Sequence, residues 1–185
     1  NASGSYDIGI NLNNVNPTAG SFTVSGNGGS CSNASASCTG GTITGATDTG
    51  VKLNNTRSVT LTRMRVANTG NFGLSGTTVN GMTIDTCLFN GTHGNAQNEG
   101  AIYVTNLLGS GSISGTEILG SANDQVRITN NTGVLNRLTI SNSTIRNTAA
   151  TGNHGLRFAS DLLSGQGAGT VMNLTVQNST FSNNH

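Results

Sequence analysis

Acidic and histidine side chains are the first residues in this chain that could do chemistry. The seven acids are widely spaced, and only Glu117 and Asp124 lie within ten residues of each other. Polar stretches such as "FNGTHGNAQNEG" and "ATGNHG" hold candidates for acid–base catalysis, which are His93, Glu99, Asp124 and His154. If the fold stacks these loops, the four side chains would line one edge and exchange protons with a substrate. The alternative is that they are solvated loop residues.

The three cysteines indicate different roles. Cys31 and Cys38 bracket the polar stretch "CSNASASC". We favour a disulfide over two free thiols, because so short a loop closes easily in an oxidising compartment. Zinc is not expected, since no histidine or second cysteine pair stands nearby. Cys87 occupies an apolar position and is expected to be a buried thiol. The sequence indicates neither a metal nor a cofactor.

Composition limits the class of protein. The 185 residues suffice for one domain, and we expect a single unit over 1–185 with a loop insertion at 25–40 that carries Cys31 and Cys38. A net charge of +1 argues against a nucleic-acid surface. No stretch approaches the roughly 18 apolar residues of a membrane helix. Both ends fall beside strand-like runs, so we expect a segment of something longer.

A recurring pattern of apolar residues runs through the chain. In "NGMTIDTCLFNGT" (80–92), Met82 and Ile84 are two apart, one residue is skipped, and Cys87 and Phe89 are again two apart. Alternation with a period of two is typical of β-strands. We interpret the pattern as two strands, b and c, with a corner at the skipped residue. The same pattern recurs in "SVTLTRMRVAN", "GSISGTEILGS", "RLTISNSTIRN" and "NLTVQNSTFSN", and in a split copy with Phe22, Val24 and Ile43.

The residue after the corner forms a column of its own. It holds small or flexible side chains, which are Met64, Cys87, Thr116, Ser143 and Ser179. We expect a narrow inside corner in which hydroxyl groups bond to the bent backbone. A catalytic role for Cys87 is therefore not expected.

A third alternating pair, strand a, precedes each copy. These inward pairs are expected at Ile8/Ile10, Val51/Leu53, Phe72/Leu74, Ile102/Val104, Val126/Ile128 and Leu156/Phe158. A unit of three short strands cannot bury its own apolar face, but stacked units form parallel sheets around a shared core. The sequence therefore predicts an all-β parallel β-helix (β-solenoid) of about six turns, each with three short strands.

Two outward faces could bind ligands. On strand a the outward column is expected to read Gly9, Lys52, Gly73, Tyr103, Arg127 and Arg157. Of these, Lys52, Tyr103, Arg127 and Arg157 could bind acidic glycans by charge and stacking. On strand b a column of Thr and Ser resembles the face of ice-binding solenoids, although threonine is favoured on exposed strands in any case. The alternative for both faces is ordinary solvated surface.

The repeats resemble the right-handed parallel β-helix of the pectin-lyase-like superfamily. More closely, they resemble the β-helical regions of large bacterial secreted and cell-surface repeat proteins. Stretches such as "GGTITGATDTGVKLNNTRSVTLTRMRV" and "GSANDQVRITNNTG" carry the resemblance over essentially the whole chain. It implies a right-handed β-helix but no single function, since the superfamily includes lyases, hydrolases, tailspikes and adhesin passenger domains. The clustered acids used by the superfamily's lyases and hydrolases are missing here.

The leading interpretation is a structural or adhesive rod of a secreted or cell-surface bacterial protein. An uncapped β-helix leaves strand edges open at both ends. The expected partners are therefore neighbouring β-helix turns of a longer chain or an end-to-end homo-oligomer. Polysaccharide is the expected ligand, whereas nucleic acid and membrane insertion are not expected. The alternatives are a polysaccharide lyase or glycoside hydrolase and an ice-binding solenoid.

Overall fold

The computed structural model describes residues 2–26, 31–32, 37–38, 41–147, 154–160 and 170–184. All regular elements in these ranges are β-strands, and the ranges contain no helix able to span a membrane. The strands are β1 (Ala2–Asn13), β2 (Phe22–Ser25), β3 (Cys31–Ser32), β4 (Ser37–Cys38), β5 (Gly41–Thr62), β6 (Met64–Thr69), β7 (Phe72–Asp85), β8 (Leu88–His93), β9 (Gly100–Ser114), β10 (Glu117–Leu119), β11 (Val126–Asn130), β12 (Val134–Ser141), β13 (Thr144–Arg146), β14 (Leu156–Ser160), β15 (Val171–Gln177) and β16 (Thr180–Ser182).

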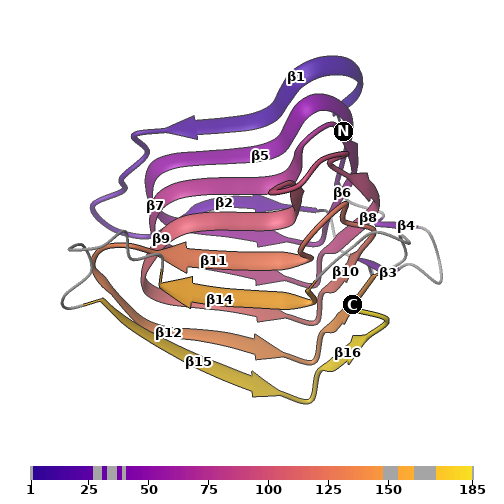
Figure 1. Cartoon of the computed structure of the whole chain (residues 1–185). Coiled ribbons are helices and arrows are strands. Elements are labelled where there is room, and N and C mark those ends of the chain that lie inside the picture. Colours follow the sequence, from indigo (N-terminus) through magenta and orange to yellow (C-terminus); the bar gives the residue numbers. More distant parts are fainter. Residues whose placement is uncertain are drawn as a thin grey trace.

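One curled sheet of parallel strands forms nearly all of this structure (Figure 1). The sheet has 14 strands, and its longest path runs β14-β11-β9-β7-β5-β6-β8-β10-β13-β16. It curls around the core like an open barrel, with successive repeats lying side by side. The remaining two strands, β3 and β4, form an antiparallel hairpin. The all-β, parallel, solenoid-like architecture predicted from the sequence is confirmed.

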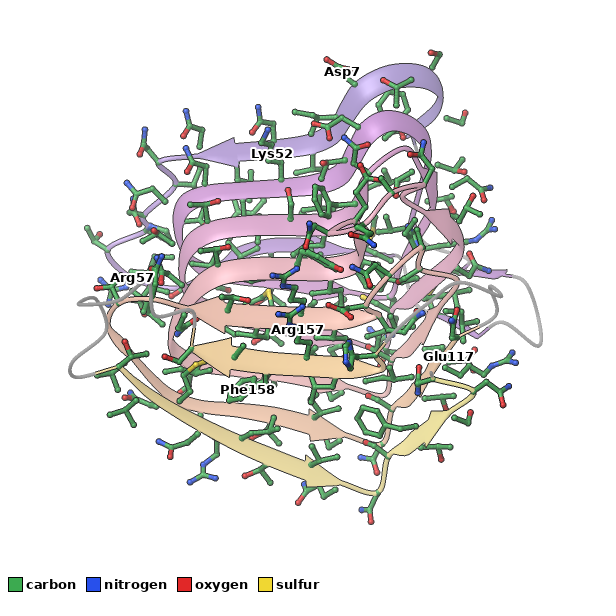
Figure 2. All side chains as sticks on the ribbon, in the orientation of Figure 1. Asp7, Lys52, Arg57, Glu117, Arg157 and Phe158 are labelled. Carbon is green, nitrogen blue, oxygen red and sulfur yellow. A yellow bond between two sulfur atoms is a disulfide. The ribbon has the colours of Figure 1, made fainter. Side chains whose placement is uncertain are left out.

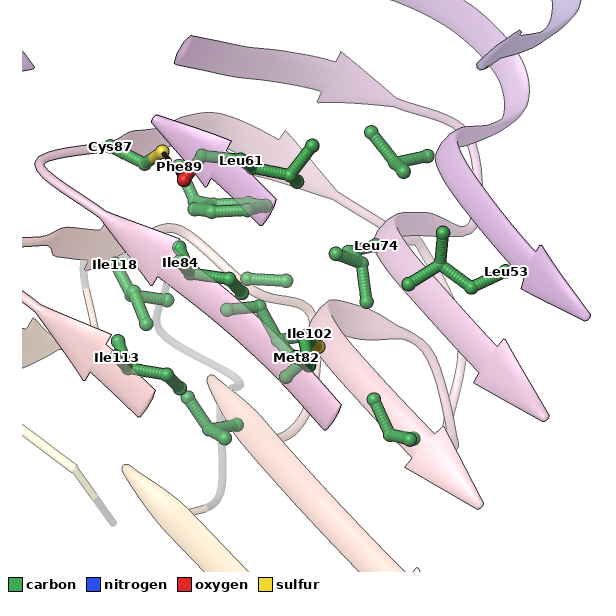
Figure 3. Close-up of a cluster of buried hydrophobic side chains, with 14 of the residues drawn as sticks. Leu53, Leu61, Leu74, Met82, Ile84, Cys87, Phe89, Ile102, Ile113 and Ile118 are labelled. Atoms are coloured by element: carbon green, nitrogen blue, oxygen red, sulfur yellow. Dashed lines mark hydrogen bonds between the residues drawn. The ribbon is translucent and has the colours of Figure 1, made fainter. Parts of the chain in front are cut away.

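The parts of the chain predicted as strands a, b and c are called segments a, b and c from here on. Segments b and c stack in the predicted register. Ile84 pairs with Leu61 on one side and with Ile113 on the other, and Phe89 pairs with Ile118. None of these five side chains is more than 2% exposed, and they lie in one cluster (Figure 3). Full burial of such a side chain contributes about 1.5–3 kcal/mol. Columns of this kind therefore join the repeats into one core.

Segment a differs from the predicted register near the start of the chain. Val51 pairs with Leu74, where the sequence pattern predicted Phe72. Ile10 pairs with Val51, where the pattern predicted Ile8. A shift of two residues preserves the alternation of inward and outward positions along the strand, so alternation alone cannot detect it. The register predicted for the last three copies is confirmed.

A glycine explains why the pattern was misaligned. Gly76 takes the inward position between Leu53 and Val104, yet it carries no apolar side chain that would mark it in the sequence. A Cβ atom at Gly76 would lie 2.9 Å from Cγ2 of Val79. Val79 lies between segments a and b and fills the inside of the corner that joins them. Glycine at position 76 leaves room for the Val79 side chain.

The skipped residue between segments b and c turns the corner with a left-handed backbone. Thr86 has a φ of +52°, and the same position in four other repeats has φ between +49° and +53°, at Arg63, Gly115, Asn142 and Asn178. The N–H of Thr86 donates to the carbonyl oxygen of Ser114 in the next repeat, at 2.8 Å. The chain therefore changes direction without losing the hydrogen bonds between repeats.

Hydroxyl groups just after the corner bond to the bent backbone, as predicted. Oγ of Ser143 donates to the carbonyl oxygen two residues earlier, at 2.8 Å, and accepts from the N–H of Thr116, at 3.2 Å. Thr116 repeats the arrangement with the N–H of Cys87, at 3.1 Å. Cys87 occupies the same position with a thiol, and burial raises its pKa to about 11. It therefore remains a neutral packing group.

The predicted loop insertion carries a disulfide. Cys31 is bonded to Cys38, and the hairpin of β3 and β4 brings both against Leu88 and Leu119. All four side chains are buried. The hairpin therefore covers apolar side chains that alternate with the inward column of segment c. The other parts of the insertion lie outside the described residues, at 27–30, 33–36 and 39–40.

We predict that Thr86→Asn stabilises the protein by about 1 kcal/mol. A β-branched residue is strained in the left-handed region, whereas asparagine tolerates it and already occupies this corner as Asn142 and Asn178. Chemical denaturation measures the change. Thr83→Asn, on the adjoining strand, is the control and should lower stability, because asparagine is disfavoured in strands. A loss of stability in both variants would contradict the strain assigned to Thr86.

Candidate functional site

The four ligand-binding candidates stand in one column on the outer face of segment a. Lys52 pairs with Ser75, Ser75 with Tyr103, Tyr103 with Arg127, and Arg127 with Arg157. Neighbouring strands lie about 4.8 Å apart, so the column presents its side chains at a regular interval. The register difference changes the two glycines expected in the column: it holds Asn11 and Ser75 in place of Gly9 and Gly73.

A shallow groove of about 430 Å³ follows part of this column. Lys52, Ser75, Tyr103 and Arg127 line it, whereas Arg157 is not among its lining residues. The groove contains two cationic side chains and one carboxylate, which belongs to Asp48. It therefore offers an open, weakly basic surface that runs across the strands.

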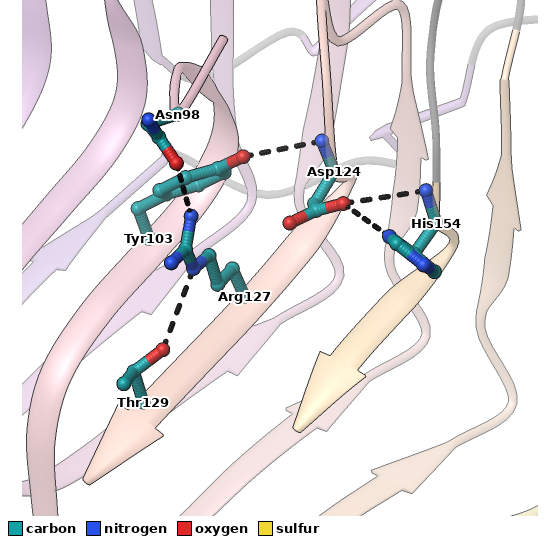
Figure 4. A network of polar contacts seen from close by, with 6 residues as sticks. All are labelled: Asn98, Tyr103, Asp124, Arg127, Thr129 and His154. Atoms are coloured by element: carbon teal, nitrogen blue, oxygen red, sulfur yellow. Dashed lines mark hydrogen bonds and ion pairs between the residues drawn. The ribbon is translucent and has the colours of Figure 1, made fainter. Parts of the chain in front are cut away.

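An aromatic ring forms the centre of the groove. The Tyr103 ring lies 5.3 Å from the Phe72 ring, and the guanidinium carbon of Arg127 lies 5.6 Å from the Tyr103 centroid. Nη1 of Arg127 donates to Oδ1 of Asn98 at 2.7 Å, and its Nε donates to Thr129 at 3.4 Å (Figure 4). These contacts hold the guanidinium over the ring, so a cation and an aromatic face are presented together.

The hydroxyl of Tyr103 adds a hydrogen-bond donor to the groove. Its oxygen accepts from the N–H of Asp124 at 3.2 Å. Burial raises the pKa of Tyr103 to about 12, so the phenol keeps its proton at neutral pH. A ligand oxygen that approached this hydroxyl would therefore meet a donor.

Lys52 is only loosely tied at its end of the groove. Its Nζ lies 4.0 Å from Oδ2 of Asp48, and both side chains are partly exposed. Oδ1 of Asp48 accepts from Asn71 at 2.9 Å and from Thr49 at 3.0 Å. The carboxylate is thus fixed by its neighbours, while the ammonium group is free to turn toward a ligand.

The four catalytic candidates do not form one accessible cluster. His93 is fully buried, with Nδ1 2.9 Å from Oγ1 of Thr69 and its ring against Phe89. Burial lowers the pKa of His93 to about 3, so the ring stays neutral in the folded protein. The carboxylate of Glu99 accepts from two backbone N–H groups of its own loop, at 2.7 and 2.9 Å. His93 is therefore out of reach of a ligand, and Oε2 of the partly exposed Glu99 is engaged within its own loop.

Asp124 and His154 are the two candidates that the structure brings together. Oδ1 of the buried Asp124 lies 2.7 Å from Nδ1 of His154 and accepts from its backbone N–H at 3.3 Å. The imidazole is half exposed, and its other nitrogen points away from Tyr103 (Figure 4). The pair ties the start of β14 to the preceding repeat. Within the described ranges, no three His, Cys, Asp or Glu side chains are grouped to hold a metal ion.

Two groove residues were not found from the sequence. The sequence pattern predicts Phe72 in the inward column of Val51 and Ile102, whereas it pairs with Thr49 and Gly100 and its ring contacts Tyr103. Asn98 lies in the loop before β9 and reaches Arg127 across 29 positions of sequence. Its left-handed φ of +66° is compatible with a loop asparagine, but no sequence motif points to the contact.

Comparison with protein-family models, with curated proteins and with solved structures finds no match to this chain.

We predict that acid destabilises the fold through His93. The folded protein keeps this ring neutral down to a pH of about 3, whereas the unfolded chain binds a proton below about pH 6.5. The stabilisation is therefore complete above pH 6.5. It falls by about 1.4 kcal/mol per pH unit as the pH drops from 6.5 toward 3. Urea unfolding between pH 7 and pH 5 measures the slope.

His93→Gln removes the buried titrating group and should flatten this slope, with lower stability at pH 7 from the altered packing. The unaltered protein, measured over the same pH range, is the reference. A full slope that persists in His93→Gln would show that another group is responsible.

Proposed function

We propose that this protein is a module of a right-handed parallel β-helix, related in architecture to the pectin-lyase-like superfamily, that binds an acidic polysaccharide on its surface. The observation that supports the ligand best is the groove in which Arg127 lies over Tyr103 in one column with Lys52. The repeat registers support about six turns of three segments over 1–185.

The chemistry of the groove favours an acidic sugar polymer over other ligands. An aromatic face stacks on the C–H face of a sugar ring, and Arg127 can bond a carboxylate with charge-assisted hydrogen bonds. Tyr103 adds a neutral donor for a hydroxyl or ring oxygen. The groove is open and its side chains recur at strand spacing, which suits an extended chain with a repeating unit better than a compact small molecule.

The rest of the molecule fits a rod that displays this surface. The core consists of stacked apolar columns, and the outer faces carry few charges, with 8% charged residues in the chain. The disulfide between Cys31 and Cys38 is of the kind that persists in oxidising compartments. We place the protein outside the cell, secreted or on the cell surface, in a structural or adhesive role.

A lyase or hydrolase is the second function to test. The buried Asp124 and the half-exposed imidazole of His154 are the only two catalytic candidates that the described structure joins. The exposed ring nitrogen points away from the groove, which favours binding over turnover. An enzyme would release unsaturated sugars or reducing ends from polygalacturonate, and a pure binding module would release neither.

We predict that Arg127→Ala weakens binding of polygalacturonate at least tenfold, because a charge-assisted hydrogen bond contributes about 1.5–3 kcal/mol. Tyr103→Ala should have an effect of similar size. Isothermal titration calorimetry or a glycan array measures both. Arg146→Ala, on β13 in segment c, is the matched control and should bind normally. Equal losses in Arg127→Ala and Arg146→Ala would mean that net charge, not the groove, attracts the polymer.

Ice binding retains one supporting observation. The outward residues of segment b pair in register as a single hydroxyl column of Thr23, Thr60, Thr83, Ser112, Thr139 and Thr175. The neighbouring column is mixed, since it includes Asp85 and Gln177. Thermal hysteresis in the purified protein would favour this function, and its absence would leave the polysaccharide groove.

A further inference from the structure

The apolar columns are open at the C-terminal end of the curled sheet. Val176 and Phe181 continue the inward columns of segments b and c, yet they are 43% and 38% exposed. Ile140 and Ile145 precede them by one repeat in the same columns and are fully buried. The difference arises because no described strand pairs with the outer edges of β14, β15 and β16.

The N-terminal end presents the opposite edges of the same columns. Ile10, Phe22 and Val24 are only partly buried, although Val51 and Leu61, one repeat further on, are at most 2% exposed. Along the described strands, β1 and β2 each pair on one side, with β5. Both ends therefore expose backbone groups and apolar side chains that a further parallel strand would cover.

The two ends match each other on all three segments. Extending the observed registers by one repeat brings Phe158 to Leu12 in segment a and Val176 to Val24 in segment b. In segment c, Ala2 pairs with Ile43, so Phe181 would meet the small side chain of Ala2. Inward residues meet inward residues in every case, and all strands keep the same direction.

The two end repeats carry little charge. The first repeat, residues 2–26, contains one acid and no lysine or arginine, whereas the last repeat, residues 154–184, contains one arginine and one acid. Asp7 lies at one end of the molecule, and Arg157 lies toward the other (Figure 2). Charge therefore does not keep the two ends apart, and the strand register decides how they pair.

We propose that the protein associates head to tail, with the N-terminal edge of one copy on the C-terminal edge of a second copy. The interface is heterologous, so it repeats without closing and yields linear chains. The register match supplies the backbone hydrogen bonds, and it selects this orientation, because only head-to-tail stacking keeps the strands parallel across the junction. The interface does not involve the polysaccharide groove, so the groove variants leave it unchanged.

Light scattering after size-exclusion chromatography, over a range of concentrations, tests the proposal. We expect the mass of the unaltered protein to rise with concentration. Val24→Lys blocks the N-terminal edge and Val176→Lys blocks the C-terminal edge, so each variant alone should be monomeric. Val134→Lys is the control. This outward valine is 45% exposed, similar to the 43% of Val176, and the variant should associate normally.

An equal mixture of Val24→Lys and Val176→Lys separates head-to-tail contact from other modes. Each variant keeps one open end, and the two open ends are complementary, so the mixture should form dimers and nothing larger. Dimers of a single variant would mean that like ends pair, which overturns the proposal. A monomeric unaltered protein at every concentration would overturn it as well. If a variant fails to fold by circular dichroism, the concentration dependence of the unaltered protein decides the matter.

Discussion

The backbone hydrogen bonds between neighbouring repeats are the constraint on which the rest of the structure depends. No repeat can pair its strands within itself, since partners such as Ile84 and Ile113 are a full repeat apart. The same pairing brings their side chains into one column, so the hydrogen-bond ladder and the core form together. A buried strand without its neighbours would leave N–H and C=O groups unsatisfied, which makes each repeat dependent on the next.

The corners show how the ladder survives a change of direction. A left-handed residue such as Thr86 rotates the chain while its N–H still reaches the next repeat. The hydroxyl of Ser143 or Thr116 then bonds both to its own repeat and to the previous one. Polar residues in these corners are therefore part of the framework. This explains how a chain with so few charges can be rich in Ser, Thr and Asn and still be ordered.

The sequence predicted most of the framework because alternation reports directly on which face a residue occupies. It predicted the columns of segments b and c and the stacking of Lys52, Tyr103, Arg127 and Arg157. It misplaced Phe72, because a shift of two residues keeps the same alternation of inward and outward positions. Gly76, which takes an inward position, has no apolar side chain that would have revealed the shift. It also could not show that His93 is buried, since burial of a loop histidine depends on tertiary contacts such as that with Thr69.

Parallel stacking also relates the proposed binding surface to the proposed self-association. The columns that place Arg127 beside Tyr103 run along the direction in which copies would stack, and the column that ends with Arg157 would continue at Asn11 and Lys52 of the next copy. A linear chain of copies would thus repeat the groove along one line. A polymer bound to several grooves at once gains avidity without any new type of contact. Under the proposed function, a weak single groove would therefore be sufficient for firm adhesion, provided that the core columns hold every copy in the same register.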